Sequence, residues 1–337
     1  MKIKWCVIGA AGIADRRTIP ALVADENNEL CAVMDKVETA AQAVGEKYGV
    51  PYYTDAEQML KEVACDAVYI ATPVFCHYEQ AMLALKYDRN VLIEKPIART
   101  EAESAEILDA FKRAGKQLSV GYMMKYHSLH QKARSFIKKD KVGKVNNVRL
   151  QFSCWYPDIP GAWRQVKALG GGGAIMDLGV HCMELAEYIL DEEIVDVKSF
   201  INTQTFSYEV EDSAVIIFKT KSGTLGHIDV NFNIPDDVSV AKLEIYGTKG
   251  YMICNNTLAQ DDVGTMAYLY APQGDYDAMQ EHAIIKPKKF RASGKNIYGK
   301  QLAEFSKHVL AGKPNYKYAK RAVHIQALCD KMYAENK

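Results

Sequence analysis

The sequence has no excess of charge of either sign, since 42 lysines and arginines balance 42 aspartates and glutamates. Proteins that bind nucleic acid or an anionic membrane surface electrostatically need a basic excess, so neither class is supported. The chain also lacks any apolar run near the length of a membrane-spanning helix. Its eight cysteines form no Cys-x-x-Cys pair and no cluster with histidine at zinc-ligand spacing. These absences argue against a bound metal and favour reduced thiols.

The start of the chain leaves no room for a leader peptide, because the first expected strand begins at residue 3. We therefore expect a cytoplasmic globular protein. Its 337 residues, of which 48% are hydrophobic, suffice for two domains with sizeable cores.

The N-terminal stretch has the order strand, glycine turn, helix that a dinucleotide-binding site requires. Residues 3–8 are typical of a buried strand, and the small residues after them open a helix whose N-terminal amides can meet a pyrophosphate. Gly9 permits the tight turn, and Ala14 lets the helix pack closely on the sheet. Ala11 stands where a second glycine is usual and narrows the approach to the pyrophosphate. The predicted cofactor contacts in this turn are Gly9, Ala11, Gly12, Ile13 and Ala14.

A second expected strand, residues 29–35, ends in an acid about 20 residues beyond the glycine turn. A carboxylate at this place binds the adenosine ribose hydroxyls and repels a 2′-phosphate, so Asp35 favours NAD over NADP. Lys36 offsets part of that repulsion, which leaves NADP open. Aspartate is also common in ordinary turns after strands, but the strand, turn, helix, strand and acid together favour the cofactor.

Strands and helices then alternate as far as residue 120. Helix 38–48, strand 67–71, helix 78–86 and strand 90–93 follow in order, and capping-box patterns at 54–57 and 100–103 open two further helices. This alternation predicts a doubly wound parallel sheet, which binds ligands at the carboxyl ends of its strands. The candidates at those ends are Thr72, Pro73, His77, Glu94 and Lys95. Of these, Lys95 could polarise a substrate oxygen, whereas His77 is favoured as a structural or cofactor-adjacent residue.

A run of four glycines precedes a second chemically informative pattern. Asp177 and His181 follow Gly170 to Gly173 and are four residues apart, so on an α-helix they would share one face. A carboxylate one turn from an imidazole can orient the ring and raise its basicity, which would suit proton transfer. The alternative is a flexible loop followed by a helix with a capping aspartate and a packed histidine.

The C-terminal half predicts a helix at 127–139, a half-buried strand at 145–154 and a series of strands joined by short turns. Such a series forms an antiparallel meander. Two helices at 296–313 and 319–335 close the chain, and we expect them to pack back near the N-terminal domain. A sheet that is apolar on both faces needs cover on both, so we expect a homodimer or homotetramer. The remaining strands are expected at 195–203, 213–220, 224–233, 241–246 and 251–255.

Several aromatic and basic residues of this half are candidates for binding a substrate. Aromatic faces bind the C–H surfaces of sugar rings, and arginine donates to hydroxyls or carboxylates. Ordinary loop packing is the alternative for all of them. The candidates are Tyr122, Lys125, Trp155, Trp163 and Arg164.

With these motifs in order, the chain resembles the Gfo/Idh/MocA oxidoreductases, the family of glucose–fructose oxidoreductase and inositol dehydrogenase. The resemblance covers nearly the whole chain, and Glu-Lys-Pro followed at this distance by Asp-x-x-x-His is its most specific part. The matching stretches are the turn from Gly9 to Ala14, Ala71-Thr72-Pro73 with His77, Glu94-Lys95-Pro96, Gly121 to His127, Gly161-Ala162-Trp163-Arg164, and Gly171 to His181.

The resemblance implies an N-terminal Rossmann domain, residues 1–121, and a substrate-binding and oligomerisation domain, residues 122–337, with an open, mainly antiparallel sheet. The family's catalytic lysine, aspartate and histidine correspond to Lys95, Asp177 and His181. Two residues depart from the family pattern. Ala11 replaces the usual second glycine, and Lys125 stands where many members have arginine.

Together these observations predict an NAD(P)-dependent dehydrogenase that acts on a secondary alcohol of a sugar, polyol or cyclitol. Either His181 or Lys95 would take the hydroxyl proton, and spacing does not decide between them. Two other activities occur among relatives: a redox-neutral glycosidase that passes through a transient keto-sugar, and a ligand sensor without catalysis. An intact acid–base set argues against the sensor, because a sensor has no need of one.

Overall fold

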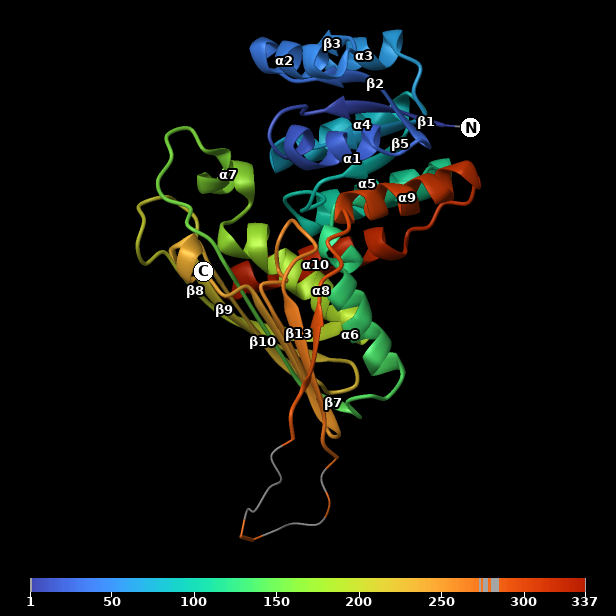
Figure 1. Cartoon of the computed structure of the whole chain (residues 1–337). Helices are drawn as coiled ribbons and strands as arrows, with labels where there is room; N and C mark the ends of the chain where they lie inside the picture. The colour runs from blue at the N-terminus through green and yellow to red at the C-terminus, as the bar shows by residue number, and fades with distance from the viewer. Residues whose placement is uncertain (1, 273, 275–277, 280–284, 337) are drawn as a thin grey trace. The chain divides into compact units, whose positions relative to one another are not determined.

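The computed structural model describes residues 2–272, 274, 278–279 and 285–336, and the chain forms two compact units (Figure 1). Both units combine stretches that are distant in the sequence. Among the described residues, no helix is long and apolar enough to cross a bilayer. The first unit consists of Met1–Tyr122, Gly161–Gly171 and Tyr298–Asp330, and the second of Met123–Pro160, Gly172–Ile297 and Lys331–Lys337.

The first unit is built on a six-stranded parallel sheet in the order β3-β2-β1-β4-β5-β6. Its central strands are aliphatic runs buried on both faces, as a sheet between two layers of helices requires. This is the doubly wound sheet that the alternation predicts. The strands are β1 (Ile3–Ile8), β2 (Asn28–Met34), β3 (Tyr52–Tyr53), β4 (Ala67–Ile70), β5 (Asn90–Ile93) and β6 (Leu118–Val120). The α-helices are α1 (Ile19–Val23), α2 (Glu38–Tyr48), α3 (Ala56–Glu62), α4 (His77–Lys86), α5 (Glu101–Ala114), α7 (Lys167–Gly170), α9 (Ile297–Leu310) and most of α10 (Lys317–Glu335).

Capping side chains set where the helices of this unit begin. The hydroxyl of Thr100 accepts a hydrogen bond from the amide of Glu103 at 3.2 Å, at the start of α5, as the capping pattern predicts. The prediction for 54–57 is corrected, because Asp55 and not Thr54 caps α3. A carboxylate and a hydroxyl accept equally well at this position, so the pattern alone does not tell them apart.

The C-terminal helix α9 completes the core of the first unit. The ring of Phe305 lies 4.8 Å from that of Trp5 on β1. The indole of Trp5 donates to the Asn28 Oδ1 at 2.8 Å, and the Ser306 hydroxyl donates to the same oxygen at 2.9 Å. The last part of the chain is thus bound to the first strands by apolar packing and by buried hydrogen bonds.

The second unit contains an eight-stranded sheet in the order β14-β13-β12-β11-β7-β10-β9-β8. Most neighbours are antiparallel, but β7 pairs with β10 in parallel, which corrects the predicted meander. In the sheet, β7 lies between β10 and β11, although the glycine run separates it from both along the chain. Two strands absent from the sequence prediction, β13 and β14, extend one edge. The strands are β7 (Val145–Ser153), β8 (Ile194–Asn202), β9 (Ser213–Thr220), β10 (Leu225–Asn231), β11 (Lys242–Gly247), β12 (Gly250–Asn255), β13 (Thr265–Tyr270) and β14 (Lys288–Arg291).

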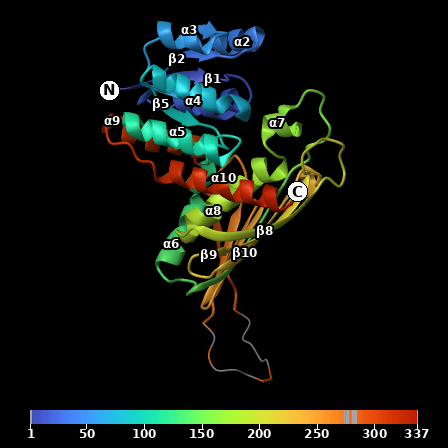
Figure 2. The same ribbon diagram turned by 180° about the vertical axis from the view of Figure 1, so that it is seen from behind.

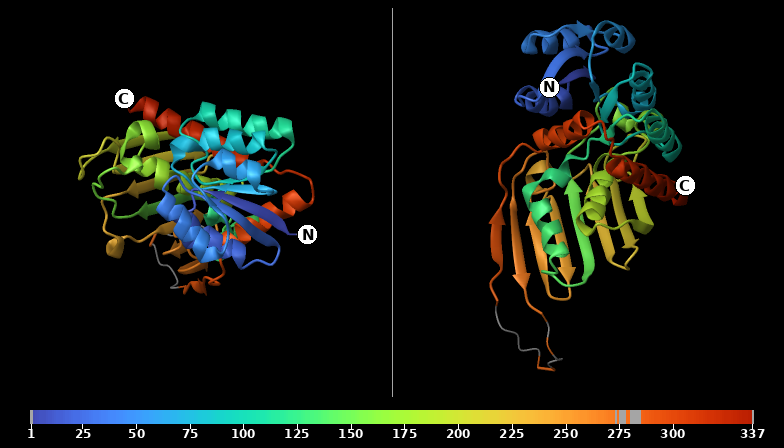
Figure 3. Two further views of the ribbon diagram at one scale, coloured as in Figure 1. Left: turned by 90° about the horizontal axis from the view of Figure 1, so that it is seen from above. Right: turned by 90° about the vertical axis from the view of Figure 1, so that its right-hand side faces the viewer.

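The two faces of this sheet have different surroundings. Helices α6 (Ser128–Lys138) and α8 (Val180–Leu190) cover one face (Figure 3). In β9, Ile216 and Phe218 are buried, whereas Val215 and Ile217 between and before them are exposed. The neighbouring strand β8 forms an edge of the sheet (Figure 2) and places Phe200, whose side chain is 85% exposed, opposite Val215. The second face therefore presents apolar residues to the surroundings.

Candidate active site

The glycine turn of the first unit fits tightly between two strand ends. Gly9 has a φ of 81°, and a Cβ there would lie 2.8 Å from the backbone of Ala71 and Thr72. The amides of Gly9 and Ala10 donate to the carbonyl of Met34 at 2.8 and 3.0 Å. Only glycine meets both the positive φ and the close approach, so the predicted reason for Gly9 is confirmed.

The acid at the end of β2 contacts this turn directly. The Asp35 carboxylate accepts from the amide of Ala11 at 3.2 Å and from that of Val37 at 3.1 Å. Gly12 has a φ of 63° and open space around its Cα, and it is exposed like Lys36. The structure therefore brings together Asp35 and the turn that sequence analysis assigns to the cofactor. A helix N-terminus, a turn without side chains and an adjacent carboxylate suit the pyrophosphate and ribose of a dinucleotide.

His77 connects the ends of β4 and β5. Its Nδ1 lies 2.9 Å from the carbonyl oxygen of Pro96, and its Nε2 lies 3.0 Å from that of Thr72. Burial lowers the pKa of His77 to about 4. The hydrogen bonds to the two carbonyls favour the protonated ring and oppose this shift. The Thr72 hydroxyl donates to Gln80 at 2.6 Å. These contacts favour a positioning role for His77 beside Thr72 and Pro73.

Glu94 is a buried carboxylate at the centre of a hydrogen-bond chain. The Tyr69 hydroxyl donates to it at 2.6 Å and itself accepts from Thr18 at 3.0 Å, while the amide of Lys95 lies 3.3 Å from the second oxygen. Burial raises the pKa of Glu94, and the tyrosine bond and Lys95 oppose that rise. A Cβ on Gly121 would lie 2.8 Å from the same carboxylate. Glu94 thus supports the turn on which the half-buried Lys95 stands.

Sequence analysis did not identify Tyr69. It lies in the aliphatic strand β4, where only its phenol, buried and in need of a partner, distinguishes it from its neighbours. Burial raises the pKa of Tyr69 well above its ordinary value, so its hydroxyl keeps its proton and donates.

The segment 161–171 belongs to the first unit and brings two predicted residues with it. The Arg164 guanidinium stacks on the Trp163 ring at 4.4 Å, and its charge lowers the pKa of Glu94. Arg99 holds the segment by donating to the carbonyl of Ala168 at 3.0 Å. Tyr122, the last residue of the unit's first stretch, is buried.

In the second unit, Asp177 and His181 lie on one continuous helical stretch with a change of pitch. Residues Ile175–Gly179 form a π-helix, η5, which runs into α8 at Val180. The predicted helix therefore has a π-turn at Asp177 and an α-helix at His181, and the two residues remain four apart on one helical stretch. Such turns often occur at functional sites.

Phe152 contacts His181, a neighbour that sequence analysis missed. The two rings meet edge to face at 6.4 Å. The alternation along β7 could have predicted this contact. Val148 and Leu150 are buried on the helix-covered face, and Phe152 lies two residues further along the same face. His181 itself is buried, so an aromatic ring and a helix surround its imidazole.

Lys125 and Trp155 have different surroundings within this unit. Lys125 is buried, and its Nζ lies 3.9 Å from the carboxylate of Glu184, which is equally buried and three residues beyond His181 on α8. Trp155 is 44% exposed, and its ring meets Phe206 edge to face at 5.1 Å.

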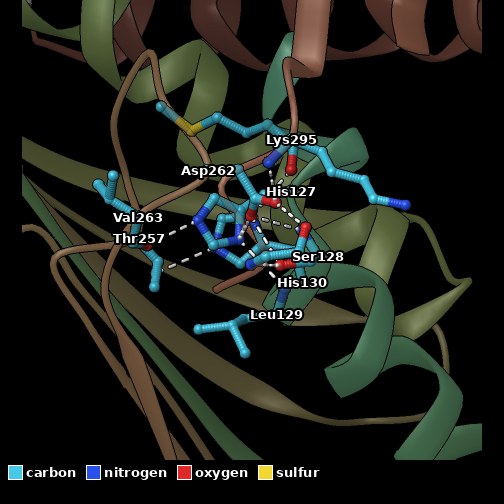
Figure 4. A network of polar contacts seen from close by, with 10 residues as sticks. His127, Ser128, Leu129, His130, Thr257, Asp262, Val263 and Lys295 are labelled. Atoms are coloured by element: carbon cyan, nitrogen blue, oxygen red, sulfur yellow. Dashed lines mark hydrogen bonds and ion pairs between the residues drawn. The ribbon is translucent and has the colours of Figure 1, made fainter. Parts of the chain in front are cut away.

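A separate polar network anchors the N-terminus of α6 (Figure 4). The Asp262 carboxylate accepts from the amide and hydroxyl of Ser128 at 2.9 and 2.7 Å and from the Ser293 hydroxyl at 2.5 Å. Although burial opposes ionisation, these bonds lower the pKa of Asp262 to about 2. The stacked pair His127 and His130 lies beside it, with ring centroids 4.5 Å apart. The Asp262 carboxylate thus binds its own loop and that of Ser293 to the first residue of α6.

Comparison with known proteins gives matches in both units. Residues 3–122 match the model of an oxidoreductase family with an NAD-binding Rossmann fold, and residues 130–253 match the GFO/IDH/MocA C-terminal domain. The chain is 26% identical to 1,5-anhydro-D-fructose reductase of Ensifer adhaerens over 264 residues, 78% of this chain and 79% of the relative. It is 25% identical to myo-inositol 2-dehydrogenase of Thermotoga maritima over 314 residues, 91% and 89% of the two chains.

Solved structures share the fold. Aldose–aldose oxidoreductase from Caulobacter crescentus, in complex with glycerol, superposes with a TM-score of 0.87 at 22% identity, over 100% of this chain and 98% of that one. Levoglucosan dehydrogenase, in complex with NADH and levoglucosan, gives 0.86 at 18% identity, over 100% and 97%.

Proposed function

Because this chain belongs to the Gfo/Idh/MocA family of NAD-binding oxidoreductases, we propose that it transfers a hydride between nicotinamide and a secondary alcohol of a sugar, polyol or cyclitol. The observation that carries the proposal is the glycine turn with Asp35 against it, in a chain that matches both family models. Its relatives are named as a reductase of an anhydro-sugar and a dehydrogenase of inositol, which supports this substrate class. We propose residues 1–121 as the cofactor domain and 122–337 as the substrate and oligomerisation domain.

Asp35 supports NAD as the preferred cofactor. Its carboxylate, fixed by the amide of Ala11, would accept from ribose hydroxyls and repel a 2′-phosphate. The nicotinamide supplies the hydride chemistry when bound. The turn residues Gly9, Gly12, Ile13 and Ala14, the strand-end residues Thr72, Pro73 and Glu94, and the neighbouring Lys36 and His77 complete the proposed cofactor contacts.

The chain's own residues would move the proton and hold the substrate. His181 takes the hydroxyl proton, and Asp177 orients the imidazole of His181. The Lys95 ammonium stabilises the developing alkoxide. If Lys95 is the base instead, His181 keeps the role of hydrogen-bond partner. The proposed substrate contacts are Lys95, Tyr122, Lys125, Trp155, Trp163, Arg164, Asp177 and His181.

The apolar outer face of the second sheet supports assembly with further copies of this chain. Exposed apolar patches on a sheet are a common site of subunit contact. We propose that Phe200, Val215 and Ile217 lie in a homodimer or homotetramer interface. A cytoplasmic location stays a prediction from the sequence.

Nicotinamide absorbance tests the proposed reaction. The pure protein is mixed with NAD, or with NADP in parallel, and with a panel of sugars, inositols and glycosides. Substrate-dependent reduction, faster with NAD, is expected. Bound cofactor without net reduction, accompanied by release of an aglycone, would replace the proposal with a redox-neutral glycosidase. Absence of any nicotinamide binding would overturn it.

Replacement of Lys95 by methionine tests the catalytic assignment. The Lys95→Met variant keeps a side chain of similar length without the charge, so we expect loss of turnover by roughly 1,000-fold or more with unchanged NADH affinity in a fluorescence titration. Lys61→Met, at an exposed lysine on α3, is the control and should leave both quantities unchanged. A large loss of NADH affinity would instead make Lys95 a cofactor-binding residue.

A further inference from the structure

A buried carboxylate holds the backbone of the glycine run. Glu211, in the loop before β9, accepts from the amide of Gly173 at 3.0 Å and from that of Ile175 at 2.9 Å. These amides stand at the start of η5, where the first N–H groups of a helix have no partner within the helix. Glu211 thus caps the helical stretch from a distant part of the chain. Its backbone carbonyl adds a bond from the amide of Ala174 at 3.1 Å.

Tyr333, in the last turn of α10, completes the arrangement. Its hydroxyl donates to Glu211 Oε1 at 2.7 Å. Close packing explains two of the glycines, because a Cβ on Gly172 would overlap the Tyr333 hydroxyl and a Cβ on Gly173 would overlap the Glu211 carbonyl. The run is therefore a tightly held segment and not the flexible loop considered from the sequence.

The charge of Glu211 suits this place. Burial raises its pKa, and the bonds from Ile175, Tyr333 and Gly173 act in the opposite direction by stabilising the carboxylate. A negative charge is also favoured at the N-terminal end of a helix by the aligned peptide dipoles. The same donors that fix the carboxylate in space thus help to keep it ionised.

We propose that Glu211 and Tyr333 form a clamp that fixes the start of η5 and thereby the positions of Asp177 and His181 further along the same helical stretch. Glu211 is then a positioning residue for the reaction, an inference that rests on the proposed roles of Asp177 and His181. The amide of Asp177 bonds to the carbonyl of Gly173 at 3.0 Å, so a shift of the clamped backbone passes directly to the aspartate. A displacement of about 1 Å at a reacting group can cost about 100-fold in rate.

Hydrogen exchange tests the clamp without reference to activity. We compare the full-length Glu211→Gln and Tyr333→Phe variants with the wild type, and expect faster exchange at residues 173–176, most of all in Glu211→Gln, where an amide group faces the backbone N–H groups. Exchange in the glycine turn at Gly9 should not change. Tyr333→Phe keeps both carboxylate–amide bonds, so it provides a milder variant if Glu211→Gln fails to fold. Unchanged exchange at 173–176 in both variants would overturn the clamp.

Glu187→Gln is the matched control. Glu187 is also a buried carboxylate and also accepts a backbone amide, that of Ile194 at 2.9 Å, but at the opposite end of α8. It should lower stability without faster exchange at residues 173–176 and without the kinetic effect described next. Equal effects of the two glutamine variants would show a general loss of packing and contradict the proposal.

Kinetics separate positioning from plain stabilisation. Glu211→Gln should lower kcat roughly 10- to 100-fold with an unchanged Kd for NADH, and it should have little further effect in a His181→Ala background, because it acts through that helix. Full multiplication of the two losses would overturn the positioning role. Wild-type turnover in His181→Ala alone would overturn the proposed function of His181, while hydrogen exchange would still decide the clamp.

Discussion

Among single residues, Tyr69 and Glu94 show how a buried polar pair can support a site from below. A phenol and a carboxylate 2.6 Å apart in the core make a charge-assisted hydrogen bond, and either group left alone would carry the full cost of its burial. The sequence shows the glutamate through its place beside Lys95. It does not show the tyrosine, because a partner across two strands follows from the register of the sheet and not from local spacing.

We predict that Tyr69→Phe lowers the free energy of unfolding by about 1.5–3 kcal/mol, because Glu94 loses its hydroxyl donor while remaining buried. Urea denaturation measures the change. Tyr87→Phe is the control, since its hydroxyl makes the same kind of bond, at 2.8 Å to Glu57, near the surface. It should cost less than about 0.5 kcal/mol. Equal losses in the two variants would contradict the importance of burial.

His130 predicts a pH dependence of stability. Its Nδ1 lies 2.8 Å from the carbonyl of Met124 and its Nε2 3.0 Å from the Thr257 hydroxyl, so the neutral ring can donate at one nitrogen and accept at the other. Burial, followed by the neighbouring His127, lowers the pKa of His130 from 6.5 to about 3. The unfolded chain therefore binds a proton between these two values that the folded chain does not bind.

The contribution of this histidine to the free energy of unfolding should accordingly be fully present above pH 6.5. Below that pH the free energy of unfolding should fall by about 1.4 kcal/mol per pH unit for this one group. Unfolding free energies from urea denaturation between pH 7 and pH 4.5 measure the slope. His130→Gln removes one titrating group and should make the slope shallower by about one proton, although His77 still contributes. A slope identical to that of the wild type would contradict this assignment.

At the scale of elements, the stability of the helical stretch η5–α8 should respond differently to replacement of the glycine before it and of a glycine within it. We predict that Gly173→Ala destabilises the protein by about 1–3 kcal/mol or more, as overpacking does, because its Cβ would overlap the Glu211 carbonyl. Gly179→Ala, at the last residue of the π-helix that Gly173 precedes, is the control. Its Cβ would meet Ile175 at an ordinary 3.5 Å, so alanine should be neutral or stabilising by up to about 1 kcal/mol. Thermal unfolding of both variants checks the contrast, and similar melting temperatures would refute it.

Local patterns predicted most elements of this chain, and non-local pairing accounts for the misses. Helix 38–48 and strand 90–93 have the predicted bounds, since capping residues, glycines and aliphatic runs mark them locally. Strand β14 carries Lys288, Lys289 and Arg291, a composition that gives no apolar alternation and suits an exposed edge. The parallel pairing of β7 and β10 was equally out of reach, because sheet order is decided by contacts between distant strands.

For the whole molecule, the candidate site also has one part that local patterns predict and one part that depends on contacts between distant segments. The glycine turn, the acid after β2 and the strand-end residues are readable because a doubly wound sheet gathers the ends of its strands at one edge. The segment Tyr298–Asp330, whose helices sequence analysis expects to pack back near the N-terminal domain, belongs to the first unit. The segment Gly161–Gly171 belongs to it as well. It joins Trp163 and Arg164 to the unit that contains Lys95, and no local pattern in that segment encodes its choice of partner.

The exposed apolar face of the second sheet leads to a prediction about the assembly of the protein. Phe200 and Val215 face each other across β8 and β9, Ile217 lies on the same face, and all three are exposed apolar side chains. Water contact with this face costs free energy in proportion to its apolar area, so copies of the chain gain by covering it.

We expect the wild type to have the mass of a dimer or tetramer in light scattering. The double variant Phe200→Asp with Ile217→Asp should have a lower mass and an unchanged Kd for NADH, because burying two unpaired carboxylates in an interface is costly. Val23→Asp, at an exposed valine of α1 in the first unit, should keep the wild-type mass. A monomeric wild type, or a double variant with wild-type mass, would refute this interface.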